Sequence, residues 1–306
     1  VVDLSPWLGT HASSVLAAGL IVGLTALQLL GVRVGLGTQL GLTVLVLGAL
    51  LCLGGSAAVR LAAGRLAVDA AAAATQTDWG QAMVFVFLAY GGWSDAATLS
   101  AELRDAQRGV LRALLWGLAL VMGFYLLANW AYVQVLGLAG LARSEAPASE
   151  LMRVVFGNEA ELAMVAGVSF AALSVMNAIL IAGPRTTYAA ARDVAQAWHL
   201  GRWDPVRGTP TAALLATSSV ALLLVGLGDL TRGGFSTMVD YLSPVYWGFL
   251  LLSGVALMVL RRKEPQAERP FKVPLYPWLP LLFCACSAYV LWASLVYVKT
   301  GALVGL

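Results

Sequence analysis

Apolar positions fall in long blocks along this chain, with shorter polar segments between them. Each block holds about 20 mostly apolar residues, the length of a helix that crosses the hydrocarbon core of a bilayer. A buried helix of a soluble protein explains one such block but not a succession of them. We therefore predict an all-α polytopic membrane protein, with residues 1–306 forming a single transmembrane domain. The predicted spans are 13–30, 36–54, 82–99, 113–138, 162–183, 211–228, 242–260 and 278–298.

Composition supports lipid as the main solvent of the chain. Hydrophobic residues make up 60% of the sequence and charged residues only 11%, whereas a soluble domain carries roughly 25% charged residues. The formal net charge of +3 gives no reason to expect nucleic acid as a partner. Cys284 and Cys286 are two positions apart and face different sides of a helix. We therefore expect no metal site and no disulfide framework at the cysteines, and we expect no cofactor.

The basic residues of the polar segments indicate how the spans are oriented. Cytoplasmic loops of membrane proteins carry an excess of Lys and Arg. Because successive spans cross the membrane in opposite directions, the polar segments alternate between its two sides, and one side receives most of the basic residues. We predict that this side is cytoplasmic. The basic residues on the predicted cytoplasmic side are Arg33, Arg104, Arg108, Arg112, Arg185, Arg192, Arg202, Arg207, Arg261, Arg262, Lys263, Arg269 and Lys272.

The chain begins at Val1 and ends within an apolar stretch, so we also expect both ends to be truncated.

The predicted span 82–99 is interrupted by the adjacent glycines Gly91 and Gly92. Each glycine weakens a helix by about 1 kcal/mol relative to alanine. An unwound segment at membrane depth is tolerated only where it lines a cavity or is buried in protein, and transporters bind substrate at such breaks. Close helix packing through small residues is the alternative. Asp95 follows the break, either as a gate or proton-coupling group or as a hydrated residue at the cytoplasmic mouth.

Three motifs along the chain carry a family resemblance. They are 89–93 with Glu102, Arg108 and 112–114; Asn177 with Arg185 and 188–193; and 260–265 with 269–277. These motifs resemble those of the amino acid–polyamine–organocation transporter superfamily, occur in the family's order and cover nearly the whole chain. The most similar branch is that of bacterial permeases related to the L-type amino acid transporters.

The resemblance implies an inverted five-plus-five helix repeat, with the predicted spans as helices four to eleven of about twelve and the N-terminal helices missing. It also implies secondary active transport of amino acids across the cytoplasmic membrane by alternating access. The backbone of the segment 87–89 would receive the substrate's amino group, and the following residues would shape its side-chain pocket. The implied substrate-binding residues are Phe87, Leu88, Ala89, Tyr90, Gly91, Gly92 and Ser94.

The sequence leaves open whether transport is coupled to Na⁺ or to H⁺. Many relatives carry a lysine on the fifth helix near the position of Val46, and this lysine can replace a sodium ion or join proton coupling. Ser174 and Asn177 are three positions apart and share one helix face. They would either line the transport path or a sodium site, or bond to neighbouring helices. Asp95, Ser174 and Asn177 are therefore the coupling or pathway candidates.

Other functions remain as alternatives. A polyamine or organic amine carrier of the same fold would use the same broken helix. A membrane-embedded enzyme needs positioned acid–base or metal-binding groups, but His11 and His199 both lie at or outside the ends of predicted spans. We therefore expect that the protein is not an enzyme. A channel or a non-transporting sensor is the third alternative. The expected partners are a small-molecule amino acid or amine and the lipid bilayer, with the oligomeric state open.

Overall fold

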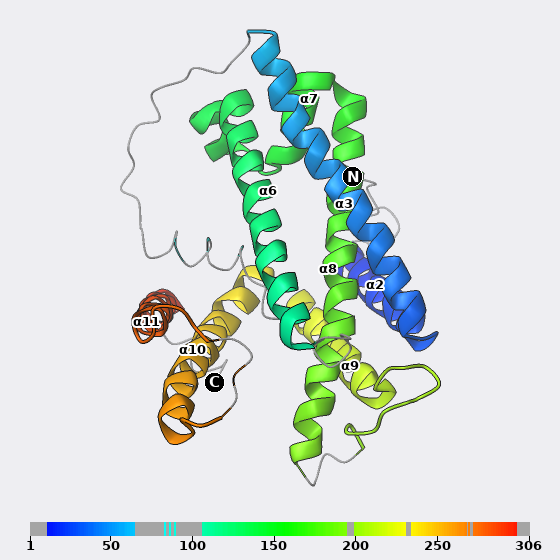
Figure 1. The fold of residues 1–306 in the computed structure, drawn as a ribbon. Coiled ribbons are helices and arrows are strands. Elements are labelled where there is room, and N and C mark those ends of the chain that lie inside the picture. The colour runs from blue at the N-terminus through cyan, green and yellow to red at the C-terminus, as the bar shows by residue number, and fades with distance from the viewer. Residues whose placement is uncertain are drawn as a thin grey trace. The chain divides into compact units, whose positions relative to one another are not determined.

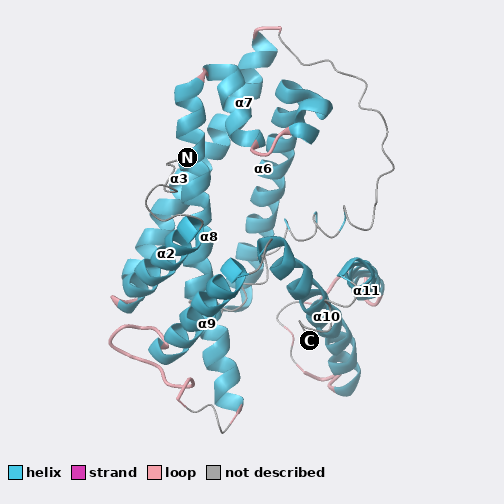
Figure 2. Cartoon of the chain, turned by 180° about the vertical axis from the view of Figure 1, so that it is seen from behind, coloured by secondary structure: helices cyan, strands magenta, loops and turns pink. Residues whose placement is uncertain are grey.

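A computed structural model describes residues 11–64, 83, 86, 89, 106–194, 199–230, 234–267, 269 and 272–298. In these residues all regular secondary structure longer than an isolated bridge is helical, which confirms the all-α prediction (Figure 2). The helices are α2 Ala12–Leu29, α3 Val32–Ala62, α6 Ala106–Arg143, α7 Pro147–Phe156, α8 Asn158–Asp193, α9 Thr211–Leu230, α10 Gly234–Lys263 and α11 Trp278–Val298 (Figure 1).

Within this described part, seven helices are long and apolar enough to cross a membrane, as expected of a multi-pass membrane protein. Each coincides with one predicted span, but several extend further. Helix α3, for example, continues beyond the predicted range 36–54 through an alanine-rich segment to Ala62, and Gly64 follows at φ 64°. A glycine in this conformation is a common helix stop. The predicted span 82–99 lies outside the described residues except for Met83, Val86 and Ala89.

Helix α7 was not predicted from the sequence. Gly137 has non-helical angles (φ 69°, ψ 170°) inside α6, close to the predicted end at residue 138. The chain then forms α7, a helix of 10 residues that begins with Pro147 and is followed by Gly157 at φ 90°. Ten residues are too few to span a bilayer, so a search for long apolar runs misses this helix.

The contacts divide the chain into two compact units. Unit 1 contains residues 1–73, 95–101 and 113–225, and unit 2 contains residues 74–94, 102–112 and 226–306. In unit 1, α3 and α8 lie side by side (Figure 1, Figure 2). The prediction that residues 1–306 form one domain stays a prediction.

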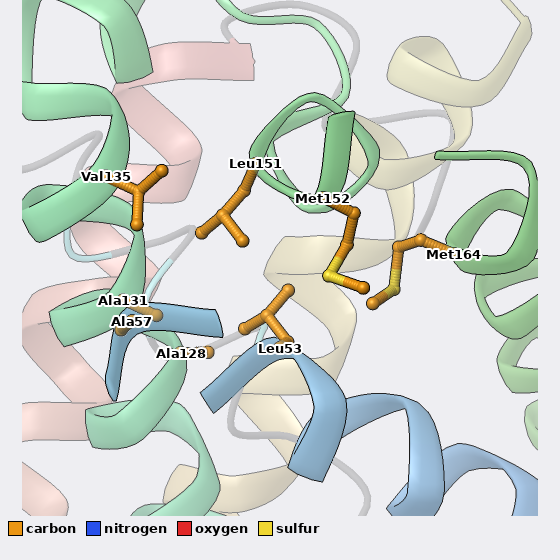
Figure 3. Close-up of a cluster of buried hydrophobic side chains, with 8 residues drawn as sticks. All are labelled: Leu53, Ala57, Ala128, Ala131, Val135, Leu151, Met152 and Met164. Atoms are coloured by element: carbon orange, nitrogen blue, oxygen red, sulfur yellow. The ribbon is translucent and has the colours of Figure 1, made fainter. Parts of the chain in front are cut away.

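The main apolar core of unit 1 joins α3, α6, α7 and α8 (Figure 3). Ala57 and Ala131 are completely buried, and small residues of this kind let membrane helices approach closely. Leu151 of α7 is also completely buried and lies in the same cluster as Leu53 of α3. Helix α7 is thus held against the membrane-spanning helices by its apolar side.

Loop contacts agree with the predicted sidedness of unit 1. At one end, the backbone N–H of Val32, next to Arg33, donates a 2.9 Å hydrogen bond to the carbonyl of Arg207. At the other end of α3, Arg60 donates a 3.1 Å bond to the carbonyl of Val154, next to Arg153. Arg33 and Arg207 therefore lie together at one end, as the charge pattern predicts.

In unit 2, α10 packs against α11. Trp247, Val290 and Ala293 form the buried apolar cluster between them. Ser243 and Ser294 join the two helices through a hydrogen bond of 3.0 Å between their hydroxyl oxygens. A Cβ atom on Gly254 would lie only 2.7 Å from the sulfur of Cys284, so the two helices approach closely at this glycine.

Candidate functional site

Most of the substrate-binding residues predicted from the sequence lie outside the described residues. Of that set the structure describes only Ala89, which is helical and exposed. The role of the segment therefore stays a prediction, as does the coupling role of Asp95, which also lies outside the described residues. The residues outside are Phe87, Leu88, Tyr90, Gly91, Gly92, Ser94 and Asp95.

The two other candidates, Ser174 and Asn177, lie together on a buried face of α8. Asn177 is completely buried and Ser174 is 8% exposed. Asn177 faces polar side chains of α2 and α3, and Ser174 faces a polar side chain of α3, all within unit 1. The sequence-based prediction that they share one helix face is confirmed, and the structure adds the partners that this face meets.

Asn177 joins three helices through its side-chain amide. Its Oδ1 accepts a 2.7 Å hydrogen bond from Nε2 of Gln28 on α2. Its Nδ2 donates to Oε1 of Gln39 on α3 at 2.9 Å and to the carbonyl of Gly35 at 3.2 Å. A primary amide has two N–H donors, so both donors of Asn177 are in use.

Gln39 continues the network to Ser174. Its Nε2 donates a 2.9 Å hydrogen bond to the hydroxyl oxygen of Ser174. The same nitrogen lies 3.5 Å from the hydroxyl oxygen of Thr43, one turn along α3. We use the name amide network for Gln28, Gly35, Gln39, Ser174 and Asn177.

Gly35 makes room for the network. A Cβ atom at this position would lie 2.1 Å from Oε1 of Gln28, well inside the distance that two such atoms allow. The absence of a side chain at Gly35 thus lets the amide of Gln28 pass the backbone of α3 and reach Asn177. This is a structural reason for glycine in the first turns of α3.

A second polar contact joins α2 to α9. Thr25 lies one turn before Gln28, and its hydroxyl oxygen is 2.8 Å from that of Ser218. Thr25 also donates a 2.7 Å bond to the carbonyl of Ile21 in its own helix. Both side chains are buried, at 7% and 4% exposure. Helices α2, α3, α8 and α9 are thus linked by polar contacts within unit 1.

The amide network is electrically neutral. It contains amides, a hydroxyl and a backbone carbonyl, so it supplies no side chain that exchanges a proton near neutral pH. Its donors and acceptors bond to each other across helices. This geometry agrees with the second sequence-based alternative, in which Ser174 and Asn177 bond to neighbouring helices. Their role in transport or ion coupling stays a prediction.

Sequence analysis missed Gln28, Gly35 and Gln39. Gln28 lies in the predicted span 13–30 and Gln39 lies in the predicted span 36–54. A primary amide buried in a membrane needs hydrogen-bond partners, so a glutamine within an apolar span was the signal that could have identified Gln28 and Gln39. Among the described residues, no group of three or more His, Cys, Asp or Glu side chains is placed to hold a metal ion.

The fold and the buried polar contacts define a multi-pass α-helical membrane protein. The chain belongs to the amino acid permease family, whose sequence pattern matches residues 3–303. This match confirms the resemblance to the amino acid–polyamine–organocation superfamily. The family is one of permeases and not of enzymes, in agreement with the sequence-based exclusion of an enzyme.

Individual relatives agree with the family. An uncharacterised transporter of Mycobacterium tuberculosis is 32% identical over 299 residues, which cover 94% of this chain and 63% of the relative. The serine/threonine exchanger SteT of Bacillus subtilis is 25% identical over 223 residues, 72% of this chain and 50% of the exchanger. The mouse b(0,+)-type amino acid transporter 1 is 28% identical over 212 residues, 68% of this chain and 41% of that transporter. The chain thus spans about two fifths to under two thirds of the length of these relatives.

Proposed function

We propose that the complete protein is a secondary active transporter of amino acids in the cytoplasmic membrane, working by alternating access. The observation that carries the proposal is the permease-family match over residues 3–303. Relatives named as amino acid transporters or exchangers support the substrate class. The apolar spans and the basic loops predicted to be cytoplasmic support a multi-pass protein of that membrane.

The substrate would be held at the break around Gly91 and Gly92. Unwound carbonyls there would accept hydrogen bonds from the substrate ammonium, as in other carriers with discontinuous helices. Phe87, Leu88 and Ala89 would supply those carbonyls. Tyr90 and Ser94 would face the substrate side chain.

The amide network would contribute rigidity. Alternating access in such folds is largely rocking or gating of one helix bundle against another, so each bundle has to keep its own internal packing. Hydrogen bonds of 2.7–2.9 Å among Gln28, Gln39, Ser174 and Asn177 support a role for α2, α3 and α8 as one rigid body. In this proposal Asn177 is a positioning residue of that body and does not touch the substrate.

Coupling would not use a lysine on the helix that carries Val46. The polar side chains that the structure shows near this part of α3, such as Thr43 and Gln39, are uncharged. Substrate exchange, a sodium gradient or proton binding at Asp95 would then supply the driving force.

The test is a flux measurement with the complete protein in liposomes. Uptake of labelled amino acids would be compared with an unlabelled counter-substrate inside, with a sodium gradient and with a pH gradient. Saturable amino acid uptake that one of these conditions accelerates is the expected result. Saturable uptake of polyamines or other organic amines alone would favour the second carrier function. Binding without flux under every condition would contradict transport and indicate a sensor.

A further inference from the structure

A cavity of about 460 Å³ lies at the end of α10 in unit 2. This volume is within the range of small-molecule sites, roughly 300–1,000 Å³. One wall is the face formed by the last turns of α10, and the other is the segment that follows the helix. The lining includes Ala256, Leu257, Leu260 and Arg261 from α10, and Arg269 and Val273 from the following segment.

The cavity lining is mostly apolar, with the hydroxyl of Ser253 and two arginines as its polar groups. Leu257 and Leu260 are 40% and 53% exposed, so apolar surface remains open on this face. Arg261 follows Leu260 at the end of the same stripe, and Arg269 adds a second guanidinium. Among the described residues, neither arginine takes part in an ion pair.

The local charge favours an anion. Residues 261–272 contain five basic and two acidic side chains, a formal charge of +3 (5 − 2). The two acids are Glu264 and Glu268. Basic pockets beside transmembrane helices on the cytoplasmic side bind anionic lipid head groups.

Internal contacts hold the two arginines in place. The guanidinium carbon of Arg261 lies 3.9 Å from the ring centroid of Tyr276. Arg269 donates hydrogen bonds to the carbonyls of Glu264 at 2.6 Å and Ala267 at 2.9 Å. Because a guanidinium has five N–H donors, these two bonds leave capacity for a phosphate.

An interfacial aromatic residue places this end of α10 near the lipid head groups. Trp278 begins α11 and is 74% exposed, and exposed Trp is enriched at the membrane–water interface. The basic side chains of Arg261, Arg262 and Lys263 end α10 in the same region of unit 2. At the membrane–water interface the phosphate of a lipid lies next to the start of its acyl chains. The arginines and the adjoining apolar wall of the cavity match these two parts of a lipid.

We propose that this cavity binds one anionic phospholipid, with the phosphate between Arg261 and Arg269 and the acyl chain along Leu257 and Leu260. The shape favours a lipid over free phosphate, because the apolar stripe would stay open under a small anion. The site is independent of the solute that the protein carries.

The test is lipid retention by the purified complete protein in nanodiscs that contain phosphatidylcholine and phosphatidylglycerol. Native mass spectrometry would count the phosphatidylglycerol molecules that remain bound after transfer to detergent. In the double variant Arg261→Gln/Arg269→Gln, retention should fall by at least about tenfold, because the charge-assisted hydrogen bonds from both guanidinium groups to the phosphate are lost. The matched control is Arg262→Gln/Lys263→Gln, which removes the same charge from neighbouring exposed positions that do not line the cavity. It should retain clearly more lipid than the Arg261/Arg269 variant, because it loses only the general attraction to anionic lipid and no bond to the phosphate.

A second variant separates lipid loss from damage to the segment that Arg269 holds. Ala256→Trp fills the cavity from α10 without changing a charge or the hydrogen bonds of Arg269, and it should also release the lipid. Equal loss in the Arg262/Lys263 control would overturn the site in favour of a diffuse charge effect. Undiminished retention in Ala256→Trp would overturn it as well. Displacement of the lipid by inorganic phosphate alone would show a simple anion site and contradict a bound phospholipid.

Discussion

Gln28 on α2 donates a 2.7 Å hydrogen bond from Nε2 to Oδ1 of Asn177 on α8, across 149 positions of sequence. Both side chains are almost completely buried, at 4% and 0% exposure. A buried amide that loses its partner pays the cost of desolvation without compensation. The bond therefore fixes the rotation of α2 against α8, because rotating either helix would separate the two amides.

Asn177→Leu should destabilise the protein by about 1–2 kcal/mol. The leucine fills a similar space but leaves Gln28 and Gln39 without the amide that they now meet, and single polar contacts between membrane helices contribute about 0.6–1.7 kcal/mol. The measurement is thermal or denaturant unfolding of the complete protein in detergent. Asn129→Leu is the control, since Asn129 is exposed and, among the described residues, its side chain bonds to the carbonyl of Tyr125 in its own helix rather than to another helix. If both variants lose the same stability, the amide network is not a specific link between helices.

Gly35→Ala should also destabilise, and the loss should depend on Gln28. The new methyl group would occupy the place of the Gln28 side chain, so the cost, about 1–2 kcal/mol, comes from the displaced hydrogen bond. In a Gln28→Ala background the same change should be neutral or stabilising. A double-mutant cycle measures this coupling directly.

Gly37→Ala is the control for that cycle. A Cβ at Gly37 meets nothing within 4 Å, so alanine should stabilise α3 by up to about 1 kcal/mol through its helix propensity. A loss of stability at Gly37 that equals the loss at Gly35 would show that the glycines matter for another reason.

Long apolar runs predicted the positions of the spans because lipid requires every span to be a helix with an apolar surface. The ends were less predictable. The predicted span 162–183 ends at Gly183, but helix α8 continues through Pro184 to Asp193, because packing against neighbouring residues buries Pro184 and Arg185 there. Ser174 and Asn177 could be placed on one face from their spacing. Gln28 and Gly35 could not be assigned as their partners, since helix rotation depends on tertiary contacts that periodicity does not contain.

The loop between α8 and α9 contains a turn whose stability depends on the charge of Asp204. The backbone N–H of Arg207 donates to Oδ1 at 3.1 Å, that of Val206 donates at 2.9 Å, and the Arg207 guanidinium donates to Oδ2 at 2.9 Å. The hydrogen bond from the Arg207 backbone, followed by the others, lowers the pKa of Asp204 from its ordinary value. A lowered pKa means that the turn is stabilised above the ordinary pKa of the carboxyl, and that this stabilisation is lost as the pH falls through the lowered value.

The turn should therefore open only in acid, below about pH 4. Digestion of the loop by pepsin across the acid range measures the opening. Asp204→Asn keeps an acceptor oxygen but does not titrate, so its digestion should lack the acid step that the unmodified protein shows. Identical profiles for the two proteins would mean that the carboxyl charge does not hold the turn.

Membrane orientation is tested by single cysteines in a background without the three native cysteines. Gln266 is exposed in the basic segment after α10, and Glu159 is exposed at the start of α8. Because basic loops resist translocation, Gln266→Cys should be protected from an impermeant reagent added to intact cells. Glu159→Cys, at the end of unit 1 away from Arg207, should be labelled. The reverse pattern would invert the proposed topology.

The proposed substrate site is tested at Gly91. Gly91→Val adds a branched side chain that restricts the backbone, favours a continuous helix by up to about 1 kcal/mol and intrudes where only backbone is expected to meet the substrate. Transport should be lost while membrane insertion and thermal stability stay close to those of the unmodified protein, because the buried clusters of the described helices are untouched. Ser94→Asn is the companion variant, and it should change the order of preference among amino acids more than the total flux, since its side chain would line the pocket. Binding and flux for a panel of amino acids, at matched membrane levels, separate the two effects. Normal transport by Gly91→Val, or failure only through misfolding, would make the glycine pair a packing feature and move the substrate site elsewhere.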